Sequence, residues 1–121
     1  MAKYEFDDYN GKIGRLYVNG KRLFVGLNDE LANDVRRIGL ELKIKVNNYD
    51  GWLTNDSAAH IREVDEDNKR ENPIFCYIFE KLSSKHKINE VSFFTGWTSA
   101  TSDDFVITDI QSIIDYYERI L

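Results

Sequence analysis

The densest group of possible metal ligands is the stretch His60-x-x-Glu63-x-Asp65, where an imidazole and two carboxylates follow at short spacing. Imidazole nitrogen and carboxylate oxygen together can bind a divalent cation. On a helix, His60 and Glu63 would share a face, because residues three apart are neighbours there. The mixed charges that follow, at 68–71, are equally typical of a solvated surface. Two interpretations stay open: a solvated surface, or a metal-dependent nuclease or phosphodiesterase that holds its cation on His60, Glu63 and Asp65.

Other patterns of catalysis are missing from the sequence. A nucleophilic hydrolase needs a serine or cysteine beside a general base, and neither histidine, His60 or His86, lies in a nucleophile-elbow context. The chain contains no G-x-x-x-x-G-K-[ST] and no G-x-G-x-x-G, which disfavours nucleotide-dependent enzymes of those two classes. The first hypothesis is therefore not an enzyme, and no cofactor is expected.

A predicted β-hairpin carries arginines and aromatic residues on one face. Asn19-Gly20 lies between two apolar-rich runs and favours a two-residue type I′ turn, because both turn positions need a positive φ. This turn places Arg15 opposite Phe24 and Tyr17 opposite Arg22. Such side chains can stack on bases or bind anions; alternatively, they form a cross-strand ladder that only stabilises the hairpin. The other face is expected to join the core through Leu16, Val18, Leu23 and Val25.

The two tryptophans, Trp52 and Trp97, each follow a glycine and precede threonine or serine residues. Each also follows a predicted strand, at 40–46 and 88–94, so both rings are placed to project from strand ends. Tryptophan is enriched at binding hot spots, and an acidic rim is available nearby from Asp56, Asp103 and Asp104. The alternative is that each indole caps the core. We take Trp52 as the core candidate and Trp97 as the surface candidate.

Three helices are predicted. The first is capped by Asn28 and stops at Gly39. The second starts at Asn72-Pro73 and runs through the apolar stretch IFCYIFEKL, whose pattern also fits a buried strand. The third starts at a capping box, with Thr108 as the cap and Gln111 three residues on. Its apolar stripe consists of Ile110, Ile113, Ile114, Tyr117, Ile120 and Leu121.

Two strands are predicted beyond the hairpin. Residues 40–46 alternate between apolar and charged side chains, as a half-buried strand does. Residues 88–94 form the other, with Val91 and Phe93 on one face. The section 47–71 is the least regular, and we expect a loop there with one short element of undecided type within 57–71.

Length and charge limit the remaining choices. A chain of 121 residues fits one domain, 1–121. Its net charge of −5 disfavours general affinity for nucleic acid and suits a partner with a basic surface. Cys76, the only cysteine, lies in an apolar run and is expected to be a buried hydrophobe. The sequence shows neither a signal-peptide pattern nor an apolar run of about 18 residues, so we expect a cytoplasmic protein without a membrane partner.

These observations predict a single α+β domain with an N-terminal β-hairpin, a mostly antiparallel sheet and about three packed helices, one of them C-terminal. For function, the first hypothesis is a small acidic binding protein that inhibits a protein partner by steric occlusion, as an immunity protein or a mobile-element inhibitor does. Trp97 and Trp52 would anchor the partner, and Asp56, Asp103 and Asp104 would steer it. The alternatives are the metal-dependent enzyme and a small-ligand-binding domain with its pocket between the tryptophans.

Overall fold

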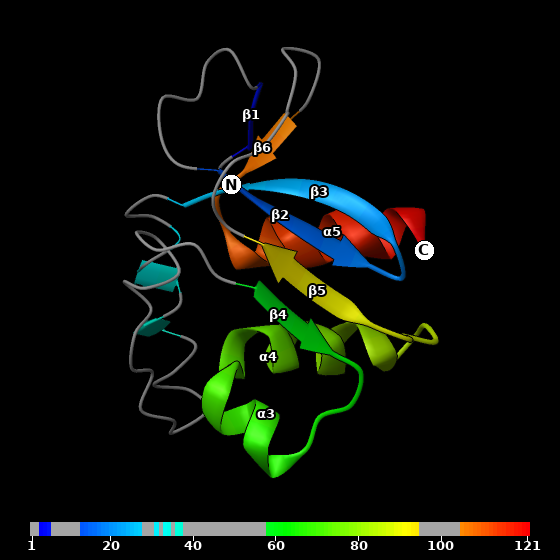
Figure 1. Ribbon diagram of the computed structural model, residues 1–121. Helices are drawn as coiled ribbons and strands as arrows, with labels where there is room; N and C mark the ends of the chain where they lie inside the picture. The colour runs from blue at the N-terminus through cyan, green and yellow to red at the C-terminus, as the bar shows by residue number, and fades with distance from the viewer. Residues whose placement is uncertain are drawn as a thin grey trace.

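The fold is built on one mixed sheet. In a computed structural model, the described residues are 3–5, 13–27, 31, 33–34, 36–37, 58–94 and 105–121. Six strands lie in the order β1-β6-β3-β2-β5-β4 (Figure 1). Their bounds are β1 Lys3–Glu5, β2 Ile13–Val18, β3 Lys21–Gly26, β4 Ala58–Ile61, β5 Val91–Phe94 and β6 Phe105–Ile107. Among these strands only β3 and β6 pair in parallel, which confirms a mostly antiparallel sheet.

The hairpin of β2 and β3 forms as its turn residues predict. Asn19 and Gly20 have φ values of 51° and 82°, the left-handed conformation that a type I′ turn requires. Arg15 pairs with Phe24 and Tyr17 with Arg22. The opposite face is buried in the core, as expected, through Leu16, Val18, Leu23 and Val25.

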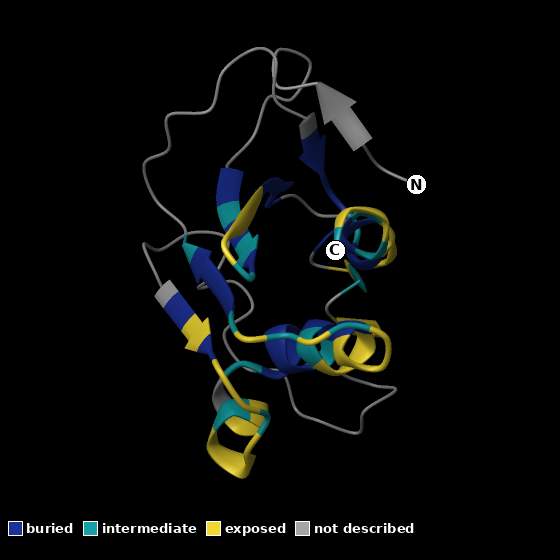
Figure 2. Cartoon of the chain, turned by 90° about the vertical axis from the view of Figure 1, so that its right-hand side faces the viewer, coloured by how far each residue is buried: buried dark blue, intermediate teal, exposed yellow. Residues whose placement is uncertain are grey.

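Two helices cover one face of the sheet. Figure 2 shows α4 (Pro73–Ser83) and α5 (Ile110–Ile120) on the same side of the strands, with their buried residues turned toward the sheet. The short helix α3 (Glu66–Glu71) contacts α4. Pro73 occupies the start of α4, as predicted, and the helix rather than the strand alternative is found. The result is an α+β fold with a C-terminal helix.

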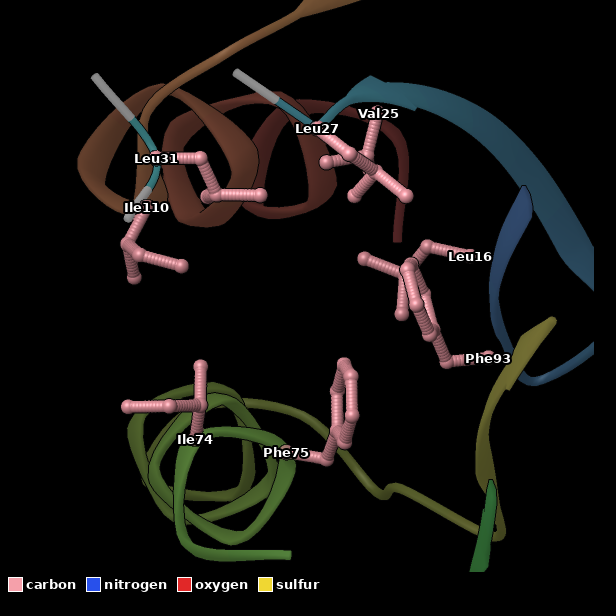
Figure 3. Close-up of a pocket in the computed structure, with 8 residues that line it drawn as sticks. All are labelled: Leu16, Val25, Leu27, Leu31, Ile74, Phe75, Phe93 and Ile110. Atoms are coloured by element: carbon pink, nitrogen blue, oxygen red, sulfur yellow. The ribbon is translucent and has the colours of Figure 1, made fainter. Parts of the chain in front are cut away.

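The core between sheet and helices is apolar and contains a stacked aromatic pair. Side chains from β2, β3, β5, α4 and α5 converge there, and the rings of Phe75 and Phe93 stack with centroids 4.8 Å apart (Figure 3). Gly14 makes room for this pair: a Cβ atom at Gly14 would lie 2.5 Å from Cζ of Phe93. Glycine is therefore required here by the close approach of a ring and not by backbone conformation.

The C-terminal helix differs from its prediction at both ends. Its N-cap is Asp109, not Thr108: the Asp109 carboxylate accepts a hydrogen bond from the backbone N–H of Ser112 at 2.7 Å. The carboxylate competes well for this position because a charged acceptor suits the positive end of the helix dipole. Ile120 is 39% exposed and does not join the core. The rest of the stripe is confirmed, since Ile110, Ile113, Ile114 and Tyr117 are buried and Leu121 packs partly against the core.

Tyr117 links α5 to the hairpin. Its hydroxyl donates to the carbonyl oxygen of Lys21 at 2.7 Å, and the carbonyl oxygen of Leu16 lies 3.1 Å from the same hydroxyl oxygen. The ring is fully buried. Burial raises the pKa of the Tyr117 hydroxyl above the ordinary tyrosine value. The phenol therefore stays a neutral donor that ties the last helix to the first hairpin.

Three further expectations are corrected or only partly covered. Within 57–71 we expected a loop with one short element, and the structure has two elements, β4 and α3. Strand β4 forms because it pairs with β5, and helix α3 begins there because Asp65 caps it. Strand β5 begins at Val91 and not at residue 88, and Val91 and Phe93 share the buried face as predicted. The described residues within 31–37 are helical, whereas the predicted ends of that helix and the strand at 40–46 lie outside the described residues.

Candidate functional site: the outer face of the sheet

The predicted partner-binding residues are not among those that the structure describes. Trp52, Asp56, Trp97, Asp103 and Asp104 all fall in the undescribed segments, so their roles stay predictions. The chain enters the segment that holds Trp97 after the end of β5, and leaves the segment that holds Trp52 at the start of β4. Those two described ends, Phe94 and Ala58, are paired residues of neighbouring strands.

The predicted metal ligands do not converge on a common point. His60 lies on strand β4 and Glu63 in the bend after it, so they are not neighbours on a helix. The Asp65 carboxylate caps α3 by accepting from the backbone N–H of Asn68 at 2.8 Å. Within the described part of the chain, no group of three histidine, cysteine, aspartate or glutamate side chains is placed to hold a metal ion.

A surface can instead be traced on the side of the sheet opposite α4 and α5. We call it the sheet face and define it by side chains from β2, β3, β4 and β5 and their immediate ends: Arg15, Tyr17, Arg22, His60, Arg62, Glu90, Ser92 and Phe94. Alternation along the strands places them there, because their neighbours Leu16, Leu23, Ile61, Val91 and Phe93 point into the core. None of the described helices α3, α4 and α5 lies over this face (Figures 1 and 2).

Phe94 is the centre of the sheet face. The rings of Tyr17 and His60 meet it edge to face, with centroids 5.8 and 5.3 Å away. The guanidinium carbon of Arg15 lies 5.5 Å from the same ring centroid. On β3, Arg22 lies 4.6 Å above the ring of Phe24. The predicted pairing of the hairpin strands is thus confirmed. Arg15 stacks on Phe94 instead of Phe24, and Arg22 stacks on Phe24 instead of Tyr17.

The charged end of the sheet face is organised around Glu90. One carboxylate oxygen accepts from Ser92 Oγ at 2.6 Å, and the other accepts from Arg62 Nε at 2.8 Å. Two hydrogen bonds lower the pKa of Glu90 from its ordinary value. The larger effect comes from the Ser92 hydroxyl, and the next from the Arg62 guanidinium. Glu90 is thereby held as an ionised acceptor that neutralises part of the charge of Arg62.

Ser92 and His60 are close, but their arrangement differs from that of a nucleophile and its base. Ser92 Oγ lies 3.4 Å from His60 Nδ1, yet the hydroxyl proton is directed to Glu90 at 2.6 Å. A hydroxyl has one proton, so imidazole cannot accept it at the same time. Ser92 is also buried. The trio therefore acts as a structural hydrogen-bond network that fixes the end of β5 against β4.

Cys76 is no better placed as a nucleophile. The thiol is free and buried on α4, as the sequence predicted. Burial, with a smaller contribution from Glu80, raises the pKa of Cys76 to about 11. The thiolate is the nucleophilic form, so at neutral pH this group is a packing element.

A hollow lies beside the charged end of the sheet face. Its volume is about 500 Å³, and its described lining residues are His60, Arg62, Glu63 and Asn68. The Asn68 side chain is engaged with the backbone carbonyl of Glu63 at 2.9 Å. The hollow is open to solvent and continues the sheet face around β4, which is one of the two edge strands among the described strands.

Half of the residues of the sheet face were candidates at the sequence level, His60 among them as a possible metal ligand. Arg15, Tyr17 and Arg22 were found because the Asn-Gly turn sets their register. Ser92 and Phe94 alternate with Val91 and Phe93, which puts them on the outer face of their strand. Nothing local indicates that this strand pairs with β2, so their position beside Tyr17 and Arg15 could not be predicted.

Comparisons with known proteins identify no relative. No protein-family model matches the chain, no curated protein matches it, and no solved structure matches it. Among the described residues, no helix is both long and apolar enough to span a bilayer.

Proposed function

We propose that the protein binds a protein partner through the sheet face and neutralises that partner by covering its functional surface. One observation carries this proposal: Arg15, Tyr17 and Phe94 pack together on a side of the sheet that none of the described helices covers. Tyrosine and arginine are the residue types that, with tryptophan, dominate binding hot spots. The described part of this face therefore supports docking of another folded protein.

The stacking of the arginines on aromatic rings favours docking, because these side chains then lose less rotamer freedom when a partner binds. A free arginine side chain loses rotamer freedom when it is immobilised, at about 0.5–1.5 kcal/mol for each side chain. Arg15 is already positioned over Phe94, and Arg22 over Phe24. Part of that cost is therefore met within the free protein, which supports a preorganised binding surface.

The same geometry disfavours a platform for nucleic-acid bases. Bases stack on open aromatic faces, but the Phe94 ring is already contacted by Arg15, Tyr17 and His60. The net charge of −5 adds a general repulsion toward phosphate backbones. A protein partner fits both observations better than a nucleic acid does.

The proposal keeps the inhibitor mechanism that the sequence suggested. Steric occlusion needs a rigid, well-anchored surface and no catalytic group, as in immunity proteins and mobile-element inhibitors. Trp97 remains the predicted second anchor, with Asp56, Asp103 and Asp104 as predicted steering charges, and a cytoplasmic site of action belongs to the same proposal. The metal-dependent and small-ligand alternatives gain no comparable support from the residues described.

The test is affinity capture from a lysate of the native host, with variants matched for surface exposure. The wild-type protein and Arg119→Ala, a change on the exposed side of α5, should capture one partner in stoichiometric amount and inhibit its activity. Tyr17→Ala combined with Arg15→Ala should capture much less, although its unfolding curve stays cooperative. Equal capture by the double variant, or no stoichiometric capture by the wild type, would overturn the proposal. Trp97→Ala tests the predicted second anchor separately.

A further inference from the structure

We infer that Asn19-Gly20 is a site of spontaneous deamidation, which the native fold protects and which, once modified, cannot restore its contacts. Asparagine followed by glycine is the pair most prone to this reaction, because glycine has no side chain to hinder its own backbone nitrogen. The reagents are water and the chain itself, so no cofactor, enzyme or partner is needed. The site is therefore independent of the proposed binding function.

The reaction is an intramolecular acyl transfer. The Gly20 backbone nitrogen loses its proton to hydroxide and attacks Cγ of Asn19, which closes a five-membered imide ring. The bond from Cγ to Nδ2 breaks, and this nitrogen takes up a proton from water and leaves as ammonia. Water then opens the ring at Cγ to give aspartate, or at the main-chain carbonyl carbon to give isoaspartate. One water is consumed for each ammonia released, and nothing is oxidised or reduced.

The nucleophile is accessible to solvent in the native protein. Gly20 is exposed, and a Cβ atom built on it would meet no atom within 4 Å. It lies between the paired strands Ile13–Val18 and Lys21–Gly26, and within the described part of the chain its N–H donates no hydrogen bond. Hydroxide can therefore reach this nitrogen. Protection has to come from the other reacting group, the Asn19 amide.

The Asn19 amide is held at both of its polar atoms. Oδ1 accepts from the backbone N–H of Asn89 at 2.6 Å and from that of Glu90 at 3.4 Å. Nδ2 donates to the Lys87 carbonyl at 2.8 Å. We call these three hydrogen bonds the Asn19 anchor. Ring closure brings Cγ to bonding distance of the Gly20 nitrogen and moves its oxygen and nitrogen out of the amide plane, so the anchor has to open first.

The two N–H groups at Oδ1 have a second possible effect, which the hydrogen bond on the other side of the amide opposes. Donors at this oxygen could stabilise the negative charge that develops there during attack. They do so only while the amide stays in place. The bond from Nδ2 to the Lys87 carbonyl, however, holds the amide back from the nucleophile and keeps the leaving nitrogen planar. The anchor as a whole therefore protects the site.

The modified residue cannot rebuild the anchor. Aspartate has a carboxylate oxygen in place of Nδ2, which cannot donate to the Lys87 carbonyl and is repelled by it. Isoaspartate also inserts a methylene group into the main chain of a two-residue turn. Both products weaken the attachment of the hairpin to the segment that leads into β5. That segment includes Glu90, which organises the charged end of the sheet face.

The chain contains its own reference site. Asn10-Gly11, which lies outside the described residues, and Asn19-Gly20 are both followed by lysine, so their downstream neighbours are identical. Trypsin cuts the chain between the two sites, so each lies in its own peptide. Mass spectrometry of those peptides then measures the deamidation rate of each site separately in the same sample.

The experiment compares the full chain at pH 8 in buffer and in urea above its unfolding transition. A synthetic peptide of residues 16–22, incubated in both solvents, corrects for any effect of urea on the chemistry. In urea the reference site and Asn19 should react at similar rates. In buffer Asn19 should react at least about tenfold more slowly than in urea, because the anchor must open first. Equal rates at Asn19 in the two solvents, or a faster rate in buffer, would overturn the inference.

Variants test the nucleophile and the consequence. Gly20→Ala should slow the reaction at Asn19 in urea, where the turn is unfolded, and an unchanged rate would exclude the Gly20 nitrogen as the nucleophile. Asn19→Asp, which stands for one product, should lower the urea midpoint of unfolding. Asn89→Asp adds the same charge nearby but keeps the backbone N–H of the anchor, and should lower the midpoint less. Equal midpoints for the two variants would contradict the loss of the anchor on deamidation.

Discussion

The side-chain oxygen of Asn19 accepts a hydrogen bond from the backbone N–H of Asn89 at 2.6 Å, across a sequence separation of 70 residues. The amide nitrogen of the same side chain donates to the Lys87 carbonyl at 2.8 Å, and the Asn19 backbone N–H donates to the backbone carbonyl of Glu90. Asn19 therefore has two functions. It supplies the left-handed turn residue of the hairpin, and it holds the segment that leads into β5.

Replacing Asn19 by glycine separates these functions. Glycine accepts the φ of 51° found at this position, but it removes both side-chain hydrogen bonds to the segment at 87–89. We expect Asn19→Gly to lower the free energy of unfolding by about 1–3 kcal/mol, at about 1 kcal/mol for each hydrogen bond with some added chain entropy. Urea denaturation measures this. A variant as stable as the wild type would mean that the side chain contributes only its turn preference.

Gly14→Ala should destabilise the core. The added methyl group would lie 2.5 Å from the Phe93 ring, which cannot retreat freely because it stacks on Phe75. Overpacking of this kind costs about 1–3 kcal/mol, to be measured from thermal or urea unfolding. The clash should be partly relieved in the double variant with Phe93→Leu, whose loss should be smaller than the sum of the single losses. Strict additivity of the two changes would contradict a direct clash.

Asp34 supports α5 from a distant part of the chain. Its carboxylate accepts from the backbone N–H of Ile110 at 2.7 Å, while Asp109 caps the same helix end from within. Removing a cap costs about 1 kcal/mol, so Asp34→Ala and Asp109→Ala should each destabilise the protein by about that amount in urea titrations. Arg119→Ala, a change on the exposed side of the same helix, should leave the stability unchanged and serves as the control. If Asp34→Ala leaves the free energy of unfolding unchanged, the hydrogen bond between Ile110 and Asp34 does not contribute to stability.

Glu90 should make stability depend on pH in the acidic range. Its pKa is lower in the folded protein than its ordinary value of 4.5, so the ionised form is favoured by folding. The resulting stabilisation is present above that ordinary value and is lost as pH falls through the folded-state pKa. The stability difference between wild type and Glu90→Gln should thus be constant near neutral pH and shrink in acid. Urea titrations at a series of pH values test this, and a difference that grows in acid would have the wrong sign.

Cys76 should be inert in the native protein. With its pKa raised to about 11 by burial, the thiol stays protonated at pH 8 and inaccessible to Ellman's reagent. It should react fully once urea unfolds the chain. Because the folded-state pKa exceeds the ordinary value of 9.0, stability should be retained below that value and fall as pH rises through 11. Fast reaction of the native protein at pH 8 would contradict the buried position.

Local rules predicted those elements whose residues supply their own constraints. The Asn19-Gly20 turn needs positive φ at both positions, and the register of β2 and β3 follows from it without knowledge of the rest of the chain. The start of α4 at Pro73 and the apolar stripe of α5 are likewise carried by neighbouring residues. The prediction failed by one residue at Thr108, where two adjacent residues both make good caps and the carboxylate of Asp109 forms the bond.

The sequence by itself determined the hairpin, its two faces and the C-terminal helix α5, because turn geometry and periodicity act over a few residues; it left α4 open between a helix and a buried strand. Only the tertiary structure decided that β5 lies between β2 and β4 and that Phe94 therefore meets Arg15, Tyr17 and His60. Strand order depends on contacts between residues far apart in the chain, which the local pattern of Val91–Phe94 does not encode. The sheet face, and any partner chemistry inferred from it, comes from that long-range pairing.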